Sequence, residues 1–311
     1  MTVDKAKQNE EQIPEMRDDR IAAIQIGEGA VRGRIVRLGP ALDEALGGDR
    51  YPEPVARLLG EAVLLSALVA SSLKFDGRLL VQAHGTNEGA VSLLVAESTS
   101  TGHIRAYARY DEAALARVLA AHKTPTARAL IGPGTFAMTI DSDIHKERYQ
   151  GIAAIAGDHL SDAAESYYET SEQIPTKIHL AVGRLQQDGA PHWRGGGLMI
   201  QRVAGDETRG DVKESWDHAR AVMATLKDIE LIDPALPPQR LLYQLFHEQG
   251  VRMDTPRTVK AECNCSRARL LETIKTFDQQ ARKDMLEDGK VTAKCQFCDE
   301  EHVFSAKEIG L

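Results

Sequence analysis

All four cysteines of this 311-residue chain lie in its last 49 positions, and they form two close pairs. One residue separates Cys263 from Cys265, two separate Cys295 from Cys298, and 29 residues lie between the pairs. Four thiolates in two such pairs can surround a tetrahedral Zn²⁺ ion, each at about 2.3 Å. The Cys-x-x-Cys spacing is common in zinc knuckles, whereas Cys-x-Cys is unusual in a structural finger. We therefore predict one Zn²⁺ per chain in the reduced state, bound by these four residues.

A site with four thiolate ligands has no coordination position left for water, which disfavours a catalytic zinc. Nor does spacing alone nominate a Ser/His/Asp constellation or a carboxylate pair for catalysis, so we predict that the chain is not an enzyme. His302 lies near the second cysteine pair and could be a spare ligand. Because four cysteines already complete the site, we expect His302 at the exposed surface.

Two functions remain open for this cysteine-containing module. A zinc ribbon that binds nucleic acid is the ordinary interpretation of such spacing. Residues 257–311, however, contain ten Lys/Arg and ten Asp/Glu, without the positive excess that a phosphate-binding face requires. The alternative is a redox sensor, because neighbouring cysteines can close into local disulfides and zinc-bound thiolates are the form that oxidants attack. Oxidation would then expel the metal and remove most of the folding energy of a small module.

The whole-chain composition favours a soluble cytoplasmic protein. Its net charge of −8 and pI near 5.7 argue against a generic binder of nucleic acid or anionic membranes. The first twenty residues are polar, lack the apolar segment of a secretory signal, and are predicted to form a loose tail. The longest apolar run, residues 62–73, fits a buried helix better than a membrane span. In a reducing cytosol, clustered thiols are more often metal ligands or redox sensors than permanent disulfides.

Residues 21–205 carry the pattern of an α+β core of mainly antiparallel sheets packed with buried helices. A helix predicted near residues 54–75 is apolar on almost every side and must be covered all round. A second helix fits residues 160–173. The glycine run at 195–197 lacks the Lys-Ser/Thr of a phosphate loop and is interpreted as a bulge where a strand starts. Strands are predicted at 31–38, 78–84, 90–96, 103–110, 135–140, 149–156, 177–182 and 196–203.

After a polar break at residues 205–211, the pattern changes to amphipathic helices. Apolar residues recur at alternating steps of four and three from Val212 to Leu226, which predicts one buried helical face. Prolines at 234, 237 and 238 stop this helix, and a short second helix at 239–250 follows. In the last fifty residues, two helical segments precede strands at both sides of the second cysteine pair. Ser305 and Glu308 have the spacing of a capping box.

The cysteine pattern, "CNCSRAR" followed by "CQFCDEEHVF", resembles that of the redox-regulated heat-shock protein 33 family of zinc-binding holdase chaperones. The segments "RGRIVRL", "LLGEAVLLSALVASSLKFDG", "ERYQGI", "YYETSEQIPT" and "GGGLMIQ" resemble its core in the same order. The similarity covers residues 30–310. One departure is Asp299, which stands where the family is expected to have glycine, and another is a longer acidic amino terminus.

The resemblance implies an ATP-independent chaperone that is zinc-bound and inactive when reduced. It implies activation by the disulfides Cys263–Cys265 and Cys295–Cys298, with zinc release, and a homodimer that binds unfolding client proteins, without nucleic acid or membrane partners. The expected organisation is a disordered tail (1–20), a chaperone core (21–205), a metastable helical linker (206–256) and a zinc module (257–311). Client binding is expected at Trp216, Met223, Leu226, Leu241, Leu242 and Phe246. The alternative is a constitutive zinc ribbon that binds nucleic acid or a fixed protein partner.

Overall fold

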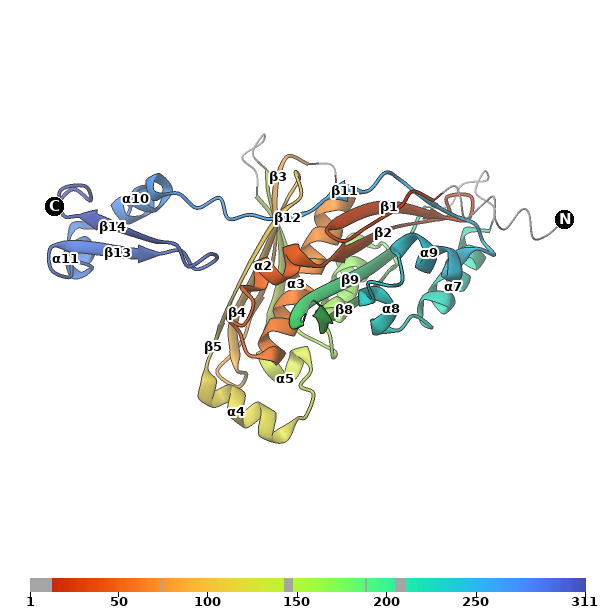
Figure 1. Ribbon diagram of the computed structural model, residues 1–311, viewed down its shortest axis with the longest axis horizontal. Helices are drawn as coiled ribbons and strands as arrows, with labels where there is room; N and C mark the ends of the chain where they lie inside the picture. Colours follow the sequence, from red (N-terminus) through yellow and green to blue (C-terminus); the bar gives the residue numbers. More distant parts are fainter. Residues whose placement is uncertain (1–12, 74, 143–147, 188, 205–210) are drawn as a thin grey trace. The chain divides into compact units, whose positions relative to one another are not determined.

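The computed structural model describes residues 13–73, 75–142, 148–187, 189–204 and 211–311 (Figure 1). The chain divides into two compact units, residues 1–261 and residues 262–311. The smaller unit thus begins five residues after the predicted boundary at 257. The reason is that two short strands, β11 (Arg257–Thr258) and β12 (Lys260–Ala261), pair with strands of the larger unit. The polar break predicted at 205–211 falls, except for Asp211, outside the described residues.

The first sheet of the larger unit has the strand order β10-β1-β2-β9-β8, with β11 also paired to β1, and all its pairs are antiparallel. β2 and β9, far apart in the chain, lie side by side from Val31–Arg202 to Leu38–Gly195. No strand was predicted at β1, whose first residue, Arg20, falls inside the predicted tail. The bounds are β1 (Arg20–Ile26), β2 (Val31–Leu38), β8 (Thr176–Gln187), β9 (Ala190–Arg202) and β10 (Val251–Met253).

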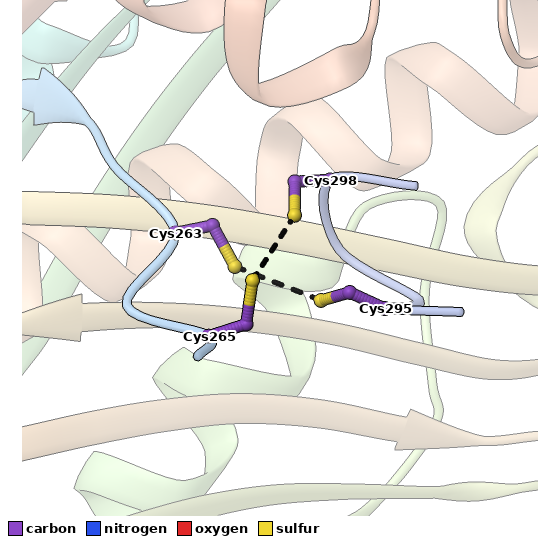
Figure 2. A group of neighbouring side chains, drawn as sticks. All are labelled: Cys263, Cys265, Cys295 and Cys298. Carbon is purple, nitrogen blue, oxygen red and sulfur yellow. Dashed lines mark hydrogen bonds between the residues drawn. The ribbon is translucent and has the colours of Figure 1, made fainter. Parts of the chain in front are cut away.

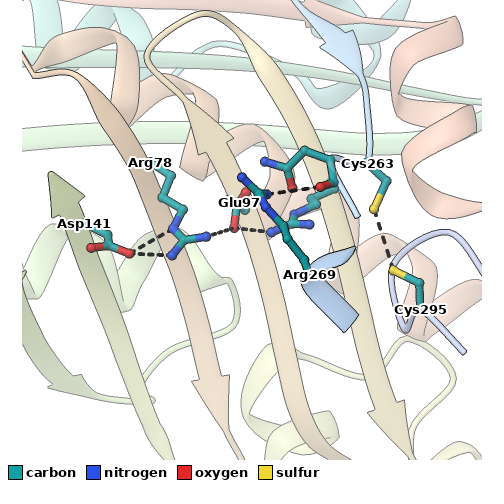
Figure 3. Close-up of polar contacts among 8 residues, drawn as sticks. Arg78, Glu97, Asp141, Cys263, Arg269 and Cys295 are labelled. Atoms are coloured by element: carbon teal, nitrogen blue, oxygen red, sulfur yellow. Dashed lines mark hydrogen bonds and ion pairs between the residues drawn. The ribbon is translucent and has the colours of Figure 1, made fainter. Parts of the chain in front are cut away.

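The second sheet has the order β12-β5-β4-β3-β6-β7, with only the β12–β5 pair parallel among its described strands. Glu97 is buried in this sheet at 3% exposure, and a buried carboxylate needs charged partners. Arg105 contacts it at 2.8 Å, and Arg78 lies between Glu97 and Asp141 (Figure 3). The bounds are β3 (Gly77–His84), β4 (Val91–Thr99), β5 (His103–Tyr110), β6 (Thr135–Ser142) and β7 (Arg148–Ala154).

Helix α3 (Glu53–Ser72) packs against strands of both sheets, which explains why it is apolar on almost every side. By length and composition it could cross a membrane, but 78% of its apolar window is buried inside the protein, as expected of a core helix. Its buried Ser66 hydroxyl donates to the Val63 carbonyl and lies 2.8 Å from Ser98 Oγ. The other core helices are α2 (Pro40–Leu46), α4 (Glu112–Ala121), α5 (Ala127–Ile131), α6 (Leu160–Tyr167) and a π-helical turn, η1 (Tyr168–Glu172).

Three helices, α7 (Val212–Met223), α8 (Asp228–Ile232) and α9 (Pro238–Phe246), lie along the first sheet (Figure 1). We keep the name linker for residues 211–256, the described part of the predicted segment 206–256. Asp211 starts α7 because its side chain accepts a hydrogen bond from the Glu214 backbone N–H. The linker forms a hydrophobic cluster with strand residues such as Ile24, Ile35 and Leu198. The opposite face of the same sheet packs in the cluster that contains α3.

The predicted tail does not extend to residue 20. Ile13 and Met16 are 7% and 2% exposed, and both belong to the linker cluster. The Met16 backbone N–H also donates to Gln239 Oε1 of α9 at 3.1 Å. These two apolar residues in a polar stretch are held by tertiary packing that local composition does not reveal. Residues 1–12 lie outside the described part of the chain.

The glycine run at 195–197 lies in the middle of β9 and pairs in register with both neighbours, so the predicted bulge is wrong. The glycines instead allow neighbouring segments to approach the backbone of β9 closely. A Cβ on Gly196 would lie 2.3 Å from the Leu231 carbonyl oxygen, and one on Gly195 would lie 2.8 Å from Leu42. Gly196 therefore allows linker helix α8 to contact the sheet backbone.

The smaller unit contains α10 (Arg267–Lys275), α11 (Gln279–Asp284) and a hairpin of β13 (Lys290–Lys294) and β14 (Glu301–Ser305). Its buried core is Ile274, Val291, Phe304 and Ile309. The Ser305–Glu308 capping box forms as predicted, at the start of a turn. So small a core indicates that the module depends on a further source of stability.

Candidate metal centre

Two loops of the smaller unit present the four cysteines. Cys263 and Cys265 precede α10, where Arg269 donates to the Asn264 carbonyl oxygen at 3.1 Å. Cys295 and Cys298 occupy the turn after β13. In that turn the Cys295 N–H donates to the Glu300 carbonyl, and the Asp299 N–H donates to the Cys295 carbonyl.

The four sulfur atoms converge, all within 4.8 Å of one another (Figure 2). Cys263 Sγ lies 3.7 Å from Cys295 Sγ, and Cys265 Sγ lies 3.3 Å from Cys298 Sγ. Ligands 2.3 Å from a tetrahedral Zn²⁺ ion would be separated by about 3.8 Å. The four predicted ligands are thus brought together at separations that suit a bound metal. Figure 3 shows Cys263 and Cys295 facing each other from the two loops.

The electrostatics of the cluster also favour a cation. Burial and hydrogen bonds to the other cysteines raise the pKa of Cys265, and burial raises that of Cys298. The pKa of Cys295 is lowered in spite of burial, because the backbone N–H groups of Cys298 and Phe297 stabilise its thiolate. The protein alone therefore stabilises the thiolate of Cys295 better than those of Cys265 and Cys298. A divalent cation would supply the charge that all four require.

None of the four cysteines forms a disulfide in this structure. The two short sulfur–sulfur contacts join cysteines of different pairs, Cys263 with Cys295 and Cys265 with Cys298. Since all four sulfurs lie within 4.8 Å, this arrangement serves metal binding and does not select the disulfides that oxidation would form. The pairing within each close pair stays a prediction.

Glu300 and His302 adjoin the cysteines. The Cys265 thiol donates to Glu300 Oε2 at 3.5 Å, and His302 Nε2 lies 3.5 Å from Glu300 Oε1. The His302 side chain is only 13% exposed, so the expected surface position is wrong. The reason is its place on β14, which turns the ring back toward the cysteine loops. Glu300 and His302 follow Cys298 closely in the sequence, and this proximity was the signal that could have placed both residues beside the cysteines.

The six residues at which client binding is expected are all buried in the linker cluster. Their exposure ranges from 6% for Trp216 to 0% for Leu242, and the set is Trp216, Met223, Leu226, Leu241, Leu242 and Phe246. They cover an apolar sheet face formed by Ala22, Ile24, Ile26, Val31, Ile35, Leu198 and Ile200. The folded linker therefore hides two apolar surfaces at once, its own and that of the sheet.

Comparison with known proteins identifies the family. A family model described as Hsp33 protein matches residues 19–305. The "33 kDa chaperonin" of Caulobacter vibrioides is 44% identical over 282 residues, covering 90% of this chain and 93% of the relative. The chaperonin of the same name from Pseudomonas paraeruginosa is 34% identical, covering 90% and 89%.

This chain belongs to the heat-shock protein 33 family. The family is one of chaperones rather than a class of enzymes. The crystal structure of the 33 kDa chaperonin from Thermotoga maritima matches the fold, with a TM-score of 0.74, 23% identity, and coverage of 94% of this chain and 96% of that one. The predicted α+β fold with a carboxy-terminal cysteine cluster is thereby confirmed.

In this member of the heat-shock protein 33 family, two buried arginines that the sequence analysis missed join the core to the linker. Arg37 of β2 is 2% exposed and donates to the carbonyl oxygens of Glu230, Asp233 and Leu236. Arg194 of β9, also 2% exposed, donates to the Ile232 carbonyl and forms a bidentate pair with Asp18. Desolvation lowers the pKa of Arg37 to about 10, which leaves it charged at neutral pH. We call these two residues the arginine clamp.

Proposed function

We propose that this chain is a redox-gated, ATP-independent holdase of the cytoplasm, inactive when reduced and zinc-bound. The observation that carries the proposal is the convergence of four cysteine sulfurs at separations near those of a tetrahedral Zn²⁺ site. Because the chain belongs to a chaperone family, we infer that its clients are unfolded or partly unfolded proteins. No nucleic acid or membrane partner is part of the proposal.

Cys263, Cys265, Cys295 and Cys298 would hold one Zn²⁺ ion in the reduced protein. When bound, the metal would keep the four sulfurs as thiolates and join the two loops. The module's core has four buried hydrophobic residues besides the cysteine cluster. Structural zinc contributes on the order of 10–16 kcal/mol of coupled binding and folding energy, so the module would be stable only with its metal.

Oxidation by a hydroperoxide would give Cys263–Cys265 and Cys295–Cys298, the pairs with the shortest loops to close. In each step two thiolates lose two electrons and form one S–S bond. The O–O bond of the hydroperoxide breaks. Two protons are taken up, and the products are one water molecule and either an alcohol or a second water molecule. A disulfide sulfur is no longer a thiolate ligand, so the metal would be released and the module would unfold.

Unfolding of the module would then loosen the linker. Release of α7, α8 and α9 would expose both the six buried linker residues and the sheet face beneath them. Large contiguous apolar surfaces of this kind bind unfolded chains without directional contacts and without nucleotide. The active form would be a homodimer.

The test is suppression of client aggregation, followed by light scattering without ATP. The reduced, zinc-loaded protein should give little protection, and the peroxide-treated protein should protect at near-stoichiometric ratios. Re-reduction with zinc should reverse the effect. Equal protection in both redox states would contradict the gate and favour a constitutive binding protein.

A further inference from the structure

Residues 250–261, which we call the strap, run along an edge strand of each sheet in the larger unit. The strap forms β10 and β11, which both pair with β1, and then β12, which pairs with β5. The Asp254 N–H donates to the Ala23 carbonyl oxygen at 2.9 Å. The Val259 N–H donates to the Asp19 carbonyl oxygen at the same distance. The strap therefore pairs with backbone groups of β1 and β5 that another extended chain could otherwise bind.

Val259 anchors the strap between the two sheets. Its side chain is 2% exposed and belongs to the core cluster, together with Ile21 of β1 and Ile104 of β5. The same three residues line a cavity of about 40 Å³, so the position has room for a larger apolar side chain. A Cβ on Gly102 would lie 2.5 Å from the Thr258 carbonyl oxygen, which shows how closely the strap backbone approaches the start of β5. We call the edges of β1 and β5, with this apolar position between them, the strap seat.

The charges of the strap suit this seat poorly at one position. Arg257 lines a second cavity, of about 420 Å³, with Arg32 and Arg34 of β2. Burial lowers the pKa of Arg34, and the neighbouring charges of Arg32 and Arg257 lower it further. Asp254, which also lines the cavity, acts in the opposite direction. Because like charges repel one another, a chain with an acidic residue in place of Arg257 would bind here more favourably.

We propose that the strap seat is a client-binding site, which the strap occupies in the reduced protein and an extended segment of an unfolded client occupies after activation. The inference rests on the proposed function, since the strap overlaps the linker and ends two residues before Cys263. The client would add a strand to β1 and β5 through backbone hydrogen bonds, which form with almost any sequence. A β-branched apolar residue, with an acidic residue two positions before it, would fit the seat best.

Binding of a labelled peptide to the full chain tests the seat. The probe is a synthetic peptide with the sequence of residues 250–261, and fluorescence anisotropy measures its binding. Oxidised protein should bind this peptide at least tenfold more tightly than reduced, zinc-bound protein, because the attached strap competes at a high effective concentration.

Three peptide variants test the chemistry of the seat. Val259→Asn should weaken binding to oxidised protein about tenfold or more, because it would bury an amide in an apolar position. Thr258→Asn is the matched control at the adjacent exposed residue and should have little effect. Arg257→Glu should tighten binding about two- to tenfold, and added salt should reduce this gain.

Two further measurements locate the bound peptide and relate it to clients. A peptide with a photoreactive residue at position 259 should crosslink near Ile21 and Ile104, as mapped by mass spectrometry. The unsubstituted peptide should also reduce the protection that oxidised protein gives to an unfolded client in the light-scattering assay.

Equal binding to both redox states, equal binding of the Val259→Asn and Thr258→Asn peptides, or crosslinks confined to other segments would overturn the strap seat. Client protection that the peptide leaves unchanged would overturn the client assignment. So would peptide binding that disappears as the protein concentration rises, because the strap of a second copy would then occupy the seat. Oxidised protein that binds the peptide but protects no client would instead overturn the proposed function.

Discussion

Asp299, directly after the last cysteine, has a backbone φ of 61°, in the left-handed region that favours glycine. Aspartate tolerates this region better than most residues. Its N–H donates to the Cys295 carbonyl, and its carboxylate lies 3.3 Å from Lys294 Nζ. The departure from the family's expected glycine therefore preserves the turn that positions Cys295 and Cys298.

This conformation leads to the first prediction. Asp299→Val should cost about 1–2 kcal/mol, because a β-branched residue is strained in the left-handed region. The zinc dissociation constant of the reduced protein should rise roughly 5- to 30-fold, since metal binding and folding are coupled. Asp299→Gly is the control and should stay within about threefold of the unsubstituted protein. Competition with a chelator measures both constants, and equal affinities for the two variants would show that the turn does not limit binding.

At the scale of elements, the arginine clamp determines how firmly the linker is held. Its donors reach carbonyl oxygens of residues 230 and 232 in α8 and of residues 233 and 236 in the segment between α8 and α9. Hydrogen bonds to a charged group contribute about 1.5–3 kcal/mol each when buried. The clamp fixes α8 while the apolar faces of α7 and α9 pack nearby, so it connects core stability to linker stability.

The second prediction is that Arg194→Ala loosens the linker without oxidation. Loss of the buried guanidinium leaves the Ile232 carbonyl and the Asp18 carboxylate without this partner, at a cost of about 2–3 kcal/mol. Amide hydrogen exchange in residues 211–256 should accelerate in the reduced, zinc-bound protein, with a gain in client protection. Arg220→Ala, at an exposed position of α7, should change neither measurement.

The third prediction concerns the start of α6, where His159 Nδ1 lies 3.1 Å from Glu61 Oε1 of α3. The hydrogen bond with Glu61 raises the pKa of His159 from 6.5 to about 9. A raised pKa means that the stabilisation is complete below pH 6.5 and is lost as the pH rises through about 9. The effect is small because His159 is 55% exposed.

Melting temperatures of reduced protein at pH 6 and pH 9.5 test this prediction. His159→Gln should lower the melting temperature at pH 6 and should change it little at pH 9.5. Glu61→Gln should remove the same pH dependence, because its neutral amide can still accept a hydrogen bond from the Leu160 backbone N–H but cannot stabilise a charged imidazolium as a carboxylate does. An equal effect of His159→Gln at both pH values would contradict an ionic contribution.

At the scale of the whole molecule, stability is distributed unequally between the two units. The larger unit has two extensive hydrophobic clusters, whereas the smaller one has four buried hydrophobic residues and the cysteine cluster. All four cysteines lie in the smaller unit, so oxidation attacks the part with the least packing. A loss on the order of 10 kcal/mol would exceed what so small a core supplies.

The fourth prediction follows from this distribution. After peroxide treatment, amide exchange should accelerate first in residues 262–311 and then in 211–256. Strands β3–β6 and helix α3 should keep their protection, because they are buried in an extensive hydrophobic cluster that contains no cysteine. Mass spectrometry of peptides resolves these segments. Uniform loss of protection, with the core opening together with the module, would contradict stepwise release.

The sequence by itself determined the cysteine cluster, the long apolar helix, most core strands and the apolar stripe from Trp216 to Leu226. These features depend on local spacing, such as ligand pairs, alternation in strands and the helical repeat. The contacts between segments that are distant in the sequence were decided only by the tertiary structure. Examples are the contacts of Arg37 and Arg194 with α8, the burial of Met16, the close approach at Gly196 and the place of His302 beside Cys265. In each case the partner lies far along the chain, so neither residue produces a local periodic pattern, and only the packing of the sheets and loops brings the two together.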